Sequence, residues 1–285
     1  MKRSDFRFFD PQRVRWAEVD MQKIVFNGHY LTYFDTAVGG YWRALALPYH
    51  DTMAALGGDL YVRKATLEYL ASARYDEQLA VGIRCARIGN SSMGFQAAVF
   101  RGEQCLVHGE LVYVFADPAT QSSQPVPPVL REVLNNFEAG LPVFELRCGS
   151  WATLGTAARA VRQAVFVDEQ GIAADLMVDD ADEAAVHGVA FNHFGVPVAA
   201  GRLLQPSRGL AQLGRMATLT SLRGAQLGKA VLQGLMQAAR DRGDVAVMLH
   251  AQTSAKGFYE RFGFASEGAL FVAAGVPHQT MRRVL

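Results

Sequence analysis

The sequence lacks the features that mark metalloproteins, disulfide-bonded proteins and membrane proteins. Its three cysteines, Cys85, Cys105 and Cys148, are odd in number and form no CxxC pair, and its seven histidines form no HExxH motif. We therefore expect reduced thiols, a cytoplasmic location and no bound metal. No apolar run is long enough to cross a membrane, and the first residues, MKRSDFRFFD, lack the apolar core of a signal peptide.

An excess of charge is also missing. The 28 basic and 27 acidic side chains leave a formal net charge of +1, so we expect no nucleic acid partner. Apolar residues, in contrast, make up half of the 285 positions, which is sufficient for two hydrophobic cores. We expect two domains, 1–140 and 141–285, because residues 117–128 are rich in Pro, Ser and Gln and a linker follows at 138–142.

The first half combines one long helix with several strands. Apolar spacing predicts a helix over 27–45 with Asn27 as its N-cap, and we expect hairpin turns at Gly89 and Gly102. Strands are expected over 14–17, 60–75, 78–88, 93–101 and 104–115, and a short helix over 129–137. The buried stripe of the long helix would hold Tyr30, Leu31, Phe34, Val38, Tyr41, Trp42 and Leu45. This order is typical of a sheet wrapped around a central helix.

Two blocks of the first half resemble a known family. The segment VRWAEVDMQKIVFNGHYLTYFDTA is similar to the opening motif of the 4-hydroxybenzoyl-CoA thioesterase-like (YbgC-type) hotdog family, and LEYLASARYDEQL is similar to its second block. The second block has Ala71-Ser72 where a proline is common. The resemblance covers residues 10–137. It implies a hotdog fold, hydrolysis of acyl-CoA thioesters, and subunits that pair through their sheets as a dimer or tetramer.

By this resemblance, Asp20 is the catalytic carboxylate, a nucleophile or general base, and the backbone N–H of Asn27 polarises the thioester carbonyl. The alternative for Asp20 is a solvated turn aspartate. Lys23 stands where many relatives have glycine, and this cation is able to pair with Asp20 and alter the approach of the thioester. Glu68 is either a second acid, as in some hotdog branches, or a surface glutamate on a strand.

A strand–turn–helix unit lies at the centre of the second half. The apolar run LGRMATL leads into a turn with Arg223, Gly224 and Gly228, after which apolar spacing predicts a helix from residue 226. Such a turn is able to hold a pyrophosphate through free N–H groups, and an ordinary connection is the alternative. We expect strands over 143–148, 186–192, 198–205, 212–220, 245–252, 264–270 and 280–284, and helices over 154–170 and 254–262. This alternation predicts a mixed α/β sheet.

This order, together with the blocks RGAQLG, VFVDEQG, HAQ and FYERFGF, resembles the GNAT N-acetyltransferase superfamily and its ElaA-type branch over residues 143–285. The resemblance implies transfer of an acyl group from CoA to an amine. Gln226 replaces the first glycine of the acyl-CoA motif, and we expect binding to persist if its φ is helical. The implied CoA-binding residues are Met216, Ala217 and Thr218 for the pantetheine, and Arg223, Gly224, Ala225, Gln226, Leu227, Gly228 and Lys229 for the pyrophosphate.

The same resemblance implies that Tyr259 protonates the departing CoA thiolate, and the alternative is an aromatic core residue. The base for the incoming amine is open among Glu169, His187 and His278. Glu169 has a structural cap as its alternative role, and His278 a hydrogen bond within a loop. The acidic residues Asp179, Asp180 and Asp182 would line a site for a cationic substrate or remain a solvated loop.

The sequence thus predicts an α/β (α+β) chain in which a hotdog thioesterase-like domain precedes a GNAT acetyltransferase-like domain. Both would use acetyl-CoA or another acyl-CoA as substrate, and the second would also take an amine. The alternative is that only one domain is catalytic and the other binds CoA or drives oligomerisation.

Overall fold

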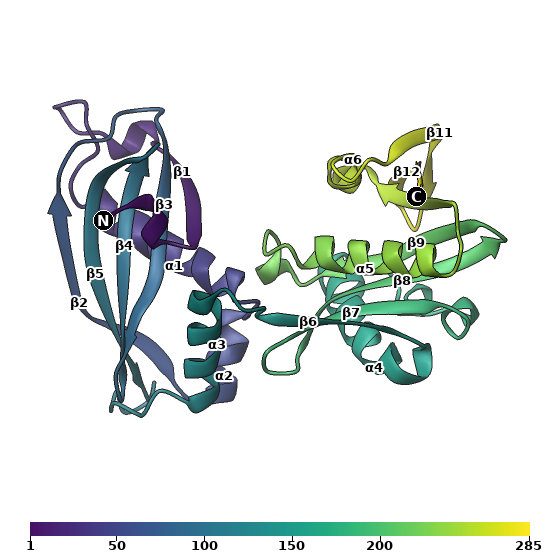
Figure 1. Ribbon diagram of the computed structural model, residues 1–285, viewed down its shortest axis with the longest axis horizontal. Helices are drawn as coiled ribbons and strands as arrows, with labels where there is room; N and C mark the ends of the chain where they lie inside the picture. The colour runs from purple at the N-terminus through teal and green to yellow at the C-terminus, as the bar shows by residue number, and fades with distance from the viewer. The chain divides into compact units, whose positions relative to one another are not determined.

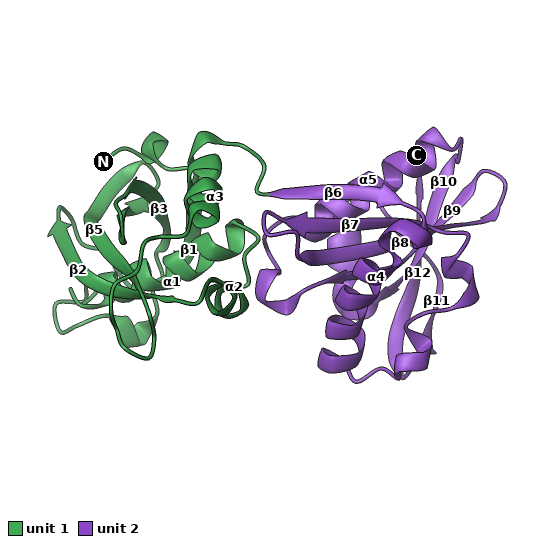
Figure 2. Ribbon diagram, turned by 90° about the horizontal axis from the view of Figure 1, so that it is seen from below, with its two compact units in different colours: residues 1–143 green, residues 144–285 purple.

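The computed structural model describes residues 1–285, which form two compact units, Met1–Val143 and Phe144–Leu285 (Figure 2). The boundary expected at residue 140 lies in the connection between the last helix of the first unit and the first strand of the second. Each unit combines helices with one sheet, which confirms the expected fold class. No helix has the length and apolar character that a membrane span needs.

The first unit is a five-stranded antiparallel sheet that packs on one long helix, α1 (His29–Ala44) (Figure 1). The strands lie in the order β1-β3-β4-β5-β2. Their bounds are Phe8–Arg13 (β1), Asp59–Tyr69 (β2), Gln78–Ile88 (β3), Ser92–Arg101 (β4) and Gln104–Ala116 (β5). Two shorter helices complete the unit, α2 (Tyr49–Leu56) and α3 (Pro128–Ala139), of which the sequence predicted only α3.

Helix α1 forms the core of this unit because its apolar residues recur at helical spacing. Six of the expected residues are buried: Tyr30, Phe34, Val38, Tyr41, Trp42 and Leu45. Leu31 was expected among them, but it is 41% exposed because each residue turns about 100° around the helix axis from the last. The N-cap is Gly28 rather than Asn27, and no side chain caps the helix. Gly40 allows α1 to approach β1, since a Cβ there would lie 2.8 Å from Asp10 Oδ1.

Three other predictions for the first unit were wrong. The first strand is β1 rather than 14–17, which contains a 3₁₀ turn at Trp16–Glu18. Strand β1 includes Pro11, and it tolerates this residue because it lies at the edge of the sheet. Strand β2 ends at Tyr69 instead of residue 75. Glu138 is part of α3 rather than a linker, because its carboxylate accepts hydrogen bonds from the Tyr41 hydroxyl (2.5 Å) and the Cys85 N–H (2.8 Å).

The second unit is a seven-stranded mixed sheet in the order β11-β12-β10-β9-β8-β7-β6. Its strands are Phe144–Gly149 (β6), Val186–Asn192 (β7), Pro197–Ser207 (β8), Leu210–Thr218 (β9), Ala246–Gln252 (β10), Ala265–Ala273 (β11) and Val276–Val284 (β12). Helices α4 (Trp151–Arg162) and α5 (Leu227–Asp241) cover opposite faces of this sheet, and α6 (Lys256–Glu260) follows β10 (Figure 1). Neighbouring residues of β7 show the two faces. A Cβ on Gly188 would touch Leu235 of α5, whereas Val189 packs with Ala158 of α4.

Strands β9 and β10 form the only parallel pair, and they pair over a short distance. The register runs from Leu210 to Leu213 on β9 and stops there, while β9 continues beside β8 as far as Thr218. Gly214 and Ala217 of β9 pair with Arg202 and Ala200 of β8. Two residues of β9 but only one of β8 lie between these pairs, which makes a β-bulge. Arg215 lies in this bulge with φ +53°. The backbone of β9 beyond Leu213 is therefore not paired on the side of β10.

The helix expected over 154–170 is not one regular α-helix. Helix α4 ends at Arg162 and continues as a π-helical segment, Gln163–Glu169. Its wider turns are closed by bonds such as the one from the Gln170 N–H to the Val165 carbonyl (3.2 Å). Such segments insert one residue into a helix and often occur at functional sites.

Candidate active sites

The N-terminus of α5 presents unsatisfied backbone N–H groups. Leu227, Gly228 and Lys229 have no acceptor for these groups within the chain, and no side chain caps the helix. The N–H groups of Gly224 and Gln226, in the preceding turn, also lack an acceptor. These free donors lie at the positive end of a helix dipole, which is an arrangement that binds anions such as a pyrophosphate.

The turn before α5 requires left-handed backbone at two positions. Gly224 has φ +92° and Gln226 has φ +63°, so the helical φ on which binding at Gln226 was conditional is not found. A glutamine there is strained, since only glycine adopts this conformation without a steric cost from Cβ. Gly228 is needed for space instead, because a Cβ there would lie 3.2 Å from Thr218 Oγ1 at the end of β9.

Glu169, at the end of the π-helical segment, holds this turn. Its carboxylate accepts hydrogen bonds from both terminal nitrogens of Arg223 (2.8 and 2.7 Å) and from the Thr220 hydroxyl (2.5 Å). Arg223, followed by Thr220, lowers the pKa of Glu169 below its usual range. Since all of these contacts tie the carboxylate to the turn, they favour the structural role of Glu169 over that of a base.

A cavity of about 890 Å³ extends from this turn to α6. Every residue expected to bind CoA lines it, with the exception of Ala225. Tyr259 lies at its inner end, 8% exposed, with its ring edge-on to Phe258 and Phe264. Burial raises the pKa of Tyr259 to about 12, and its hydroxyl has no hydrogen-bond partner within the chain. This hydroxyl therefore stays protonated at neutral pH and is available to a ligand.

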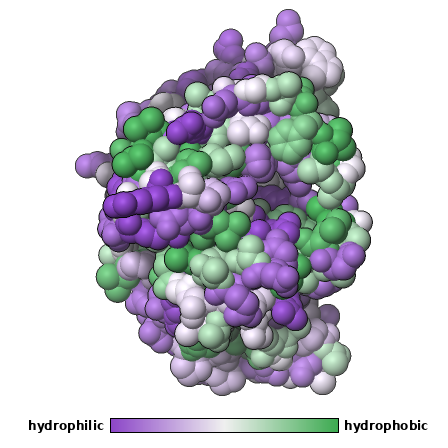
Figure 3. All heavy atoms as spheres, turned by 90° about the vertical axis from the view of Figure 1, so that its right-hand side faces the viewer, coloured by the Kyte–Doolittle hydropathy of each residue, from purple (hydrophilic) through white to green (hydrophobic).

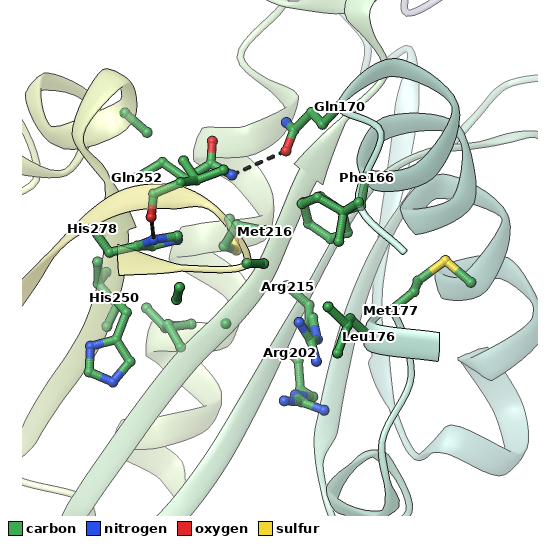
Figure 4. Close-up of a pocket in the computed structure, with 18 of the residues that line it drawn as sticks. Phe166, Gln170, Leu176, Met177, Arg202, Arg215, Met216, His250, Gln252 and His278 are labelled. Carbon is green, nitrogen blue, oxygen red and sulfur yellow. Dashed lines mark hydrogen bonds between the residues drawn. The ribbon is translucent and has the colours of Figure 1, made fainter. Parts of the chain in front are cut away.

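A second cavity of about 340 Å³ meets the first at Met216, Tyr259 and the pair Gln170 and Gln252. The Gln252 amide donates to Gln170 Oε1 (3.1 Å), as Figure 4 shows. His278 lines this cavity and donates from Nδ1 to the Val276 carbonyl (2.8 Å), which leaves its Nε2 free to accept a proton. The structure thus places His278 in the second cavity, and its role as a base stays a prediction.

A second histidine in this cavity escaped the sequence analysis. His250, in the HAQ block, lines the same cavity as His278. Burial, and then the nearby His278, lower the pKa of His250. Register could have identified it, since His250 and Thr280 are paired across β10 and β12, two residues from the position of His278.

The acidic segment is neither a substrate site nor a solvated loop. Asp182 is 1% exposed and accepts hydrogen bonds from Arg162 (3.0 Å to each oxygen) and Arg202 (3.0 Å). Asp179 binds Arg202 and also Arg215 (2.9 Å). Asp180 alone is exposed without a partner. The predictions for Asp179 and Asp182 were wrong because their partners come from α4, β8 and β9, far away in the sequence.

His187 is fully buried beside this cluster and does not reach either cavity. Its Nε2 donates to the Asp182 carbonyl (2.9 Å), and its Nδ1 lies 3.3 Å from a terminal nitrogen of Arg162. Burial lowers its pKa, so it is neutral. This position removes His187 as a candidate base.

In the first unit, Asp20 and Asn27 line one cavity of about 400 Å³, together with Tyr30, Tyr69 and residues 70–72. The Gln22 N–H donates to Asp20 Oδ1 (2.8 Å), and Oδ2 makes no hydrogen bond. The backbone N–H of Asn27 has no acceptor within the chain, whereas its carbonyl accepts from the Tyr69 hydroxyl (3.1 Å). A free carboxylate oxygen and a free N–H donor therefore share this cavity.

Glu18 positions this loop, although the sequence analysis did not single it out. Its buried carboxylate accepts hydrogen bonds from the Tyr33 hydroxyl (2.7 Å) and the Arg15 N–H (2.7 Å), and its carbonyl accepts from the Phe26 N–H. Lys23 has φ +60° and forms no ion pair with Asp20, so the possible pairing of these two side chains is not found. Glu68 is exposed, outside the cavity, and lies 3.5 Å from His108, which agrees with a surface role.

Comparisons with known proteins agree with both halves of this description. Residues 163–285 match the acetyltransferase (GNAT) domain family, and residues 22–108 match the thioesterase superfamily. The uncharacterised N-acetyltransferase YjcF of Bacillus subtilis (strain 168) is 36% identical over 125 residues, which cover 43% of this chain and 87% of YjcF. The acyl-CoA thioester hydrolase YbgC of Escherichia coli O157:H7 is 26% identical over 122 residues, which cover 41% of this chain and 87% of YbgC.

Among solved structures, an acyl-CoA N-acyltransferase from Pseudomonas aeruginosa aligns at 30% identity with a TM-score of 0.45, covering 49% of this chain and 99% of that one. The chain belongs to the GNAT acetyltransferase family through its second unit, and its first unit matches the thioesterase superfamily over residues 22–108. The fusion expected from the sequence is confirmed. Both families use acyl-CoA, and no group of three or more His, Cys, Asp or Glu side chains is arranged as a metal site.

Proposed function

We propose that the chain is a bifunctional acyl-CoA enzyme. The second unit transfers an acyl group, such as acetyl, from CoA to an amine, and the first unit hydrolyses an acyl-CoA thioester. The observation that carries the proposal is the row of free N–H groups at the start of α5, which opens into the 890 Å³ cavity ending at Tyr259. This cavity is within the size range of ligand sites, and its two ends match the two ends of a CoA thioester.

In the second unit, the pyrophosphate binds at the N–H groups of the turn and α5, and the pantetheine follows the unpaired backbone of Met216–Thr218. The thioester then lies where the two cavities meet. His278 Nε2 takes a proton from the ammonium group of the acceptor, and the free amine attacks the thioester carbonyl. As the C–S bond breaks, the Tyr259 hydroxyl gives its proton to the thiolate. The nitrogen loses its second proton, which restores the Tyr259 hydroxyl, and the products are an amide and free CoA.

In the first unit, the Asn27 N–H donates to the thioester oxygen, which gains negative charge in the transition state. Asp20 either attacks the carbonyl carbon, which releases CoA and leaves an anhydride that water then hydrolyses, or removes a proton from the attacking water. The products are a carboxylic acid and free CoA.

The test of the second site is acetyl-CoA binding measured by isothermal titration calorimetry on the full chain. Gly228→Glu places a carboxylate at the α5 N-terminus and crowds Thr218, so we expect at least a tenfold loss of affinity. Gly257→Glu, where a Cβ would meet nothing within 4 Å, is the matched control. Unchanged affinity in Gly228→Glu would refute the pyrophosphate site at the start of α5.

The test of the first site is release of free thiol from a series of acyl-CoA thioesters without any amine. We expect Asp20→Asn to lower kcat by about a hundredfold or more, since it removes the carboxylate that carries the chemistry. Asp35→Asn, an exposed position on α1, should leave hydrolysis unchanged. If the unaltered chain hydrolyses none of the thioesters, the alternative holds, in which the first unit binds CoA or drives oligomerisation.

An even-numbered oligomer completes the proposal for the first unit. Strand β2 lies at the edge of its sheet, and its residues from Arg63 to Thr66 are exposed on both faces. Tyr69 and Leu70, which line the Asp20 cavity, are 52% and 58% exposed. A second copy against β2 would cover both side chains. Light scattering coupled to size-exclusion chromatography tests this, and a monomer at micromolar concentration would contradict it.

A further inference from the structure

The 340 Å³ cavity has an unusual charge at one end. Its lining includes two arginines, Arg202 and Arg215, and the two histidines, but no aspartate or glutamate. Figure 4 shows the two guanidinium groups together beside Leu176 and Met177, across the cavity from His250 and His278. An acceptor with a second positive charge would meet only cationic and neutral groups here.

The positive and negative charges of the side chains around Arg202 and Arg215 do not cancel. Three guanidinium groups, of Arg162, Arg202 and Arg215, meet two carboxylates, of Asp179 and Asp182, while His187 is neutral. One positive charge is therefore in excess. The Nε atoms of Arg202 and Arg215 are buried and make no hydrogen bond. The Nε of Arg162, which lines neither cavity, also lacks a partner, and such buried donors are rare in folded proteins.

The backbone holds these arginines in place. Arg215 sits in the β-bulge of β9 with φ +53°, a strained conformation for a residue with a Cβ. Arg202, on the paired strand β8, is 7% exposed and bound to both aspartates. Their positions are thus set before any ligand enters, which lowers the entropic cost of binding.

We propose that the acceptor of the second unit is an amine that also bears a carboxylate, held by Arg202 and Arg215, and a separate apolar body. An excess of one positive charge matches a carboxylate better than a doubly charged phosphate, and guanidinium groups bind carboxylates through paired hydrogen bonds. The apolar body follows from Phe166, Ile172, Leu176 and Leu249, which line the rest of the cavity. Apolar amino acids are the simplest compounds of this class. This inference rests on the proposed acyl transfer.

The first experiment compares L-leucine, L-leucinamide and 3-methylbutylamine as acceptors, with acetyl-CoA as donor and free thiol as the readout. We expect kcat/KM to be at least about tenfold higher for leucine than for either analogue, because a hydrogen-bonded charged group is lost in both. The amide has the more easily deprotonated amine, so a preference for leucine does not come from amine reactivity. Equal or better transfer to the analogues would overturn the proposal.

The variants Arg215→Gln and Arg215→Lys test the residue itself. Arg215→Gln should raise the KM for leucine about ten- to a hundredfold and leave the KM for acetyl-CoA and transfer to 3-methylbutylamine unchanged. Arg215→Lys should restore part of the loss. Folding is expected to survive, since Arg202 keeps Asp179 paired and the Arg215 side chain is 30% exposed. Arg208→Gln, an exposed position in the β8–β9 hairpin, is the matched control.

The second experiment separates this inference from the proposed reaction. Calorimetry on the full chain with saturating CoA measures the binding of leucine and leucinamide without any chemistry. Tighter binding of leucine that disappears in Arg215→Gln supports the carboxylate site even if no transfer occurs, in which case only the proposed reaction fails. Equal binding of the two compounds, or leucine binding that Arg215→Gln leaves unchanged, refutes the carboxylate site.

Discussion

The substitution Asp182→Asn provides the sharpest stability test of the second unit. In the structure, the Asp182 carboxylate is 1% exposed and accepts hydrogen bonds from Arg162, Arg202 and the Asp179 N–H (3.0, 3.0 and 3.1 Å). Asparagine keeps the shape but removes the negative charge, which leaves the fully buried Arg162 without its counter-ion. Removal of one partner from a buried ion pair costs about 3–5 kcal/mol. We therefore expect the free energy of unfolding of this unit to fall by about 3 kcal/mol.

The assay is differential scanning calorimetry on the full chain, with hydrogen exchange to assign each transition. A loss of about 3 kcal/mol in a unit of this size lowers Tm by about 10 °C. The transition of the first unit should not move. Asp180→Asn removes an exposed, unpaired carboxylate two positions before Asp182 in the same turn and should change stability by less than about 0.5 kcal/mol. A Tm shift below about 3 °C in Asp182→Asn would refute the reasoning. It would mean that the cost of burying the charged Asp182 nearly cancels its attraction to Arg162 and Arg202.

The pH dependence of stability provides a second test of the ion pairs of Asp182. Burial by itself raises the pKa of Asp182, but the Asp179 N–H and the Arg162 guanidinium outweigh it, so the pKa lies below the ordinary 3.8. The unfolded chain thus takes up this proton more readily than the folded chain. The contribution to stability is present above pH 3.8 and is lost as the pH falls below that value. Asp182→Asn should show a shallower loss of Tm in this acid range.

Two further predictions concern the sites themselves. Gln226→Gly and Lys23→Gly remove the steric strain of a side chain at positive φ. Each should raise the free energy of unfolding of its unit by up to about 1 kcal/mol, measured by denaturant titration. A lower free energy of unfolding in either variant would contradict the presence of strain. Tyr259→Phe keeps the ring contacts with Phe258 and Phe264 and removes only the hydroxyl, so it should lower kcat of acyl transfer about a hundredfold while the Kd for acetyl-CoA stays constant. An unchanged kcat would remove Tyr259 from the reaction.

The elements that sequence predicted well are those with a local period. The buried stripe of α1 and the strand β7 follow from spacing alone, because burial there repeats along one element. The blocks around Asp20 and Tyr259 were identified through resemblance, and the structure places each in a cavity. Whether these residues act as expected stays a prediction.

The features that sequence missed depend on contacts between distant segments. Asp182 pairs with Arg162 and Arg202, each 20 positions away, and no local pattern distinguishes it from the exposed Asp180. The positive φ at Gln226 is imposed by the turn that joins β9 to α5, although the residue type disfavours it. The bulge at Arg215 arises from unequal spacing of two strands, which only the register reveals.

The π-helical segment makes the second unit more sensitive to chain length than to side-chain identity. Its wide turn accommodates one extra residue. The last residue of the segment, Glu169, reaches Arg223, and the next residue, Gln170, reaches Gln252. Inserting one further residue after Ala164 would exceed what the wide turn accommodates and rotate both side chains by about 100°. The turn before α5 and the junction of the two cavities would lose their contacts together. A single-codon insertion here would therefore disrupt both cavities at once.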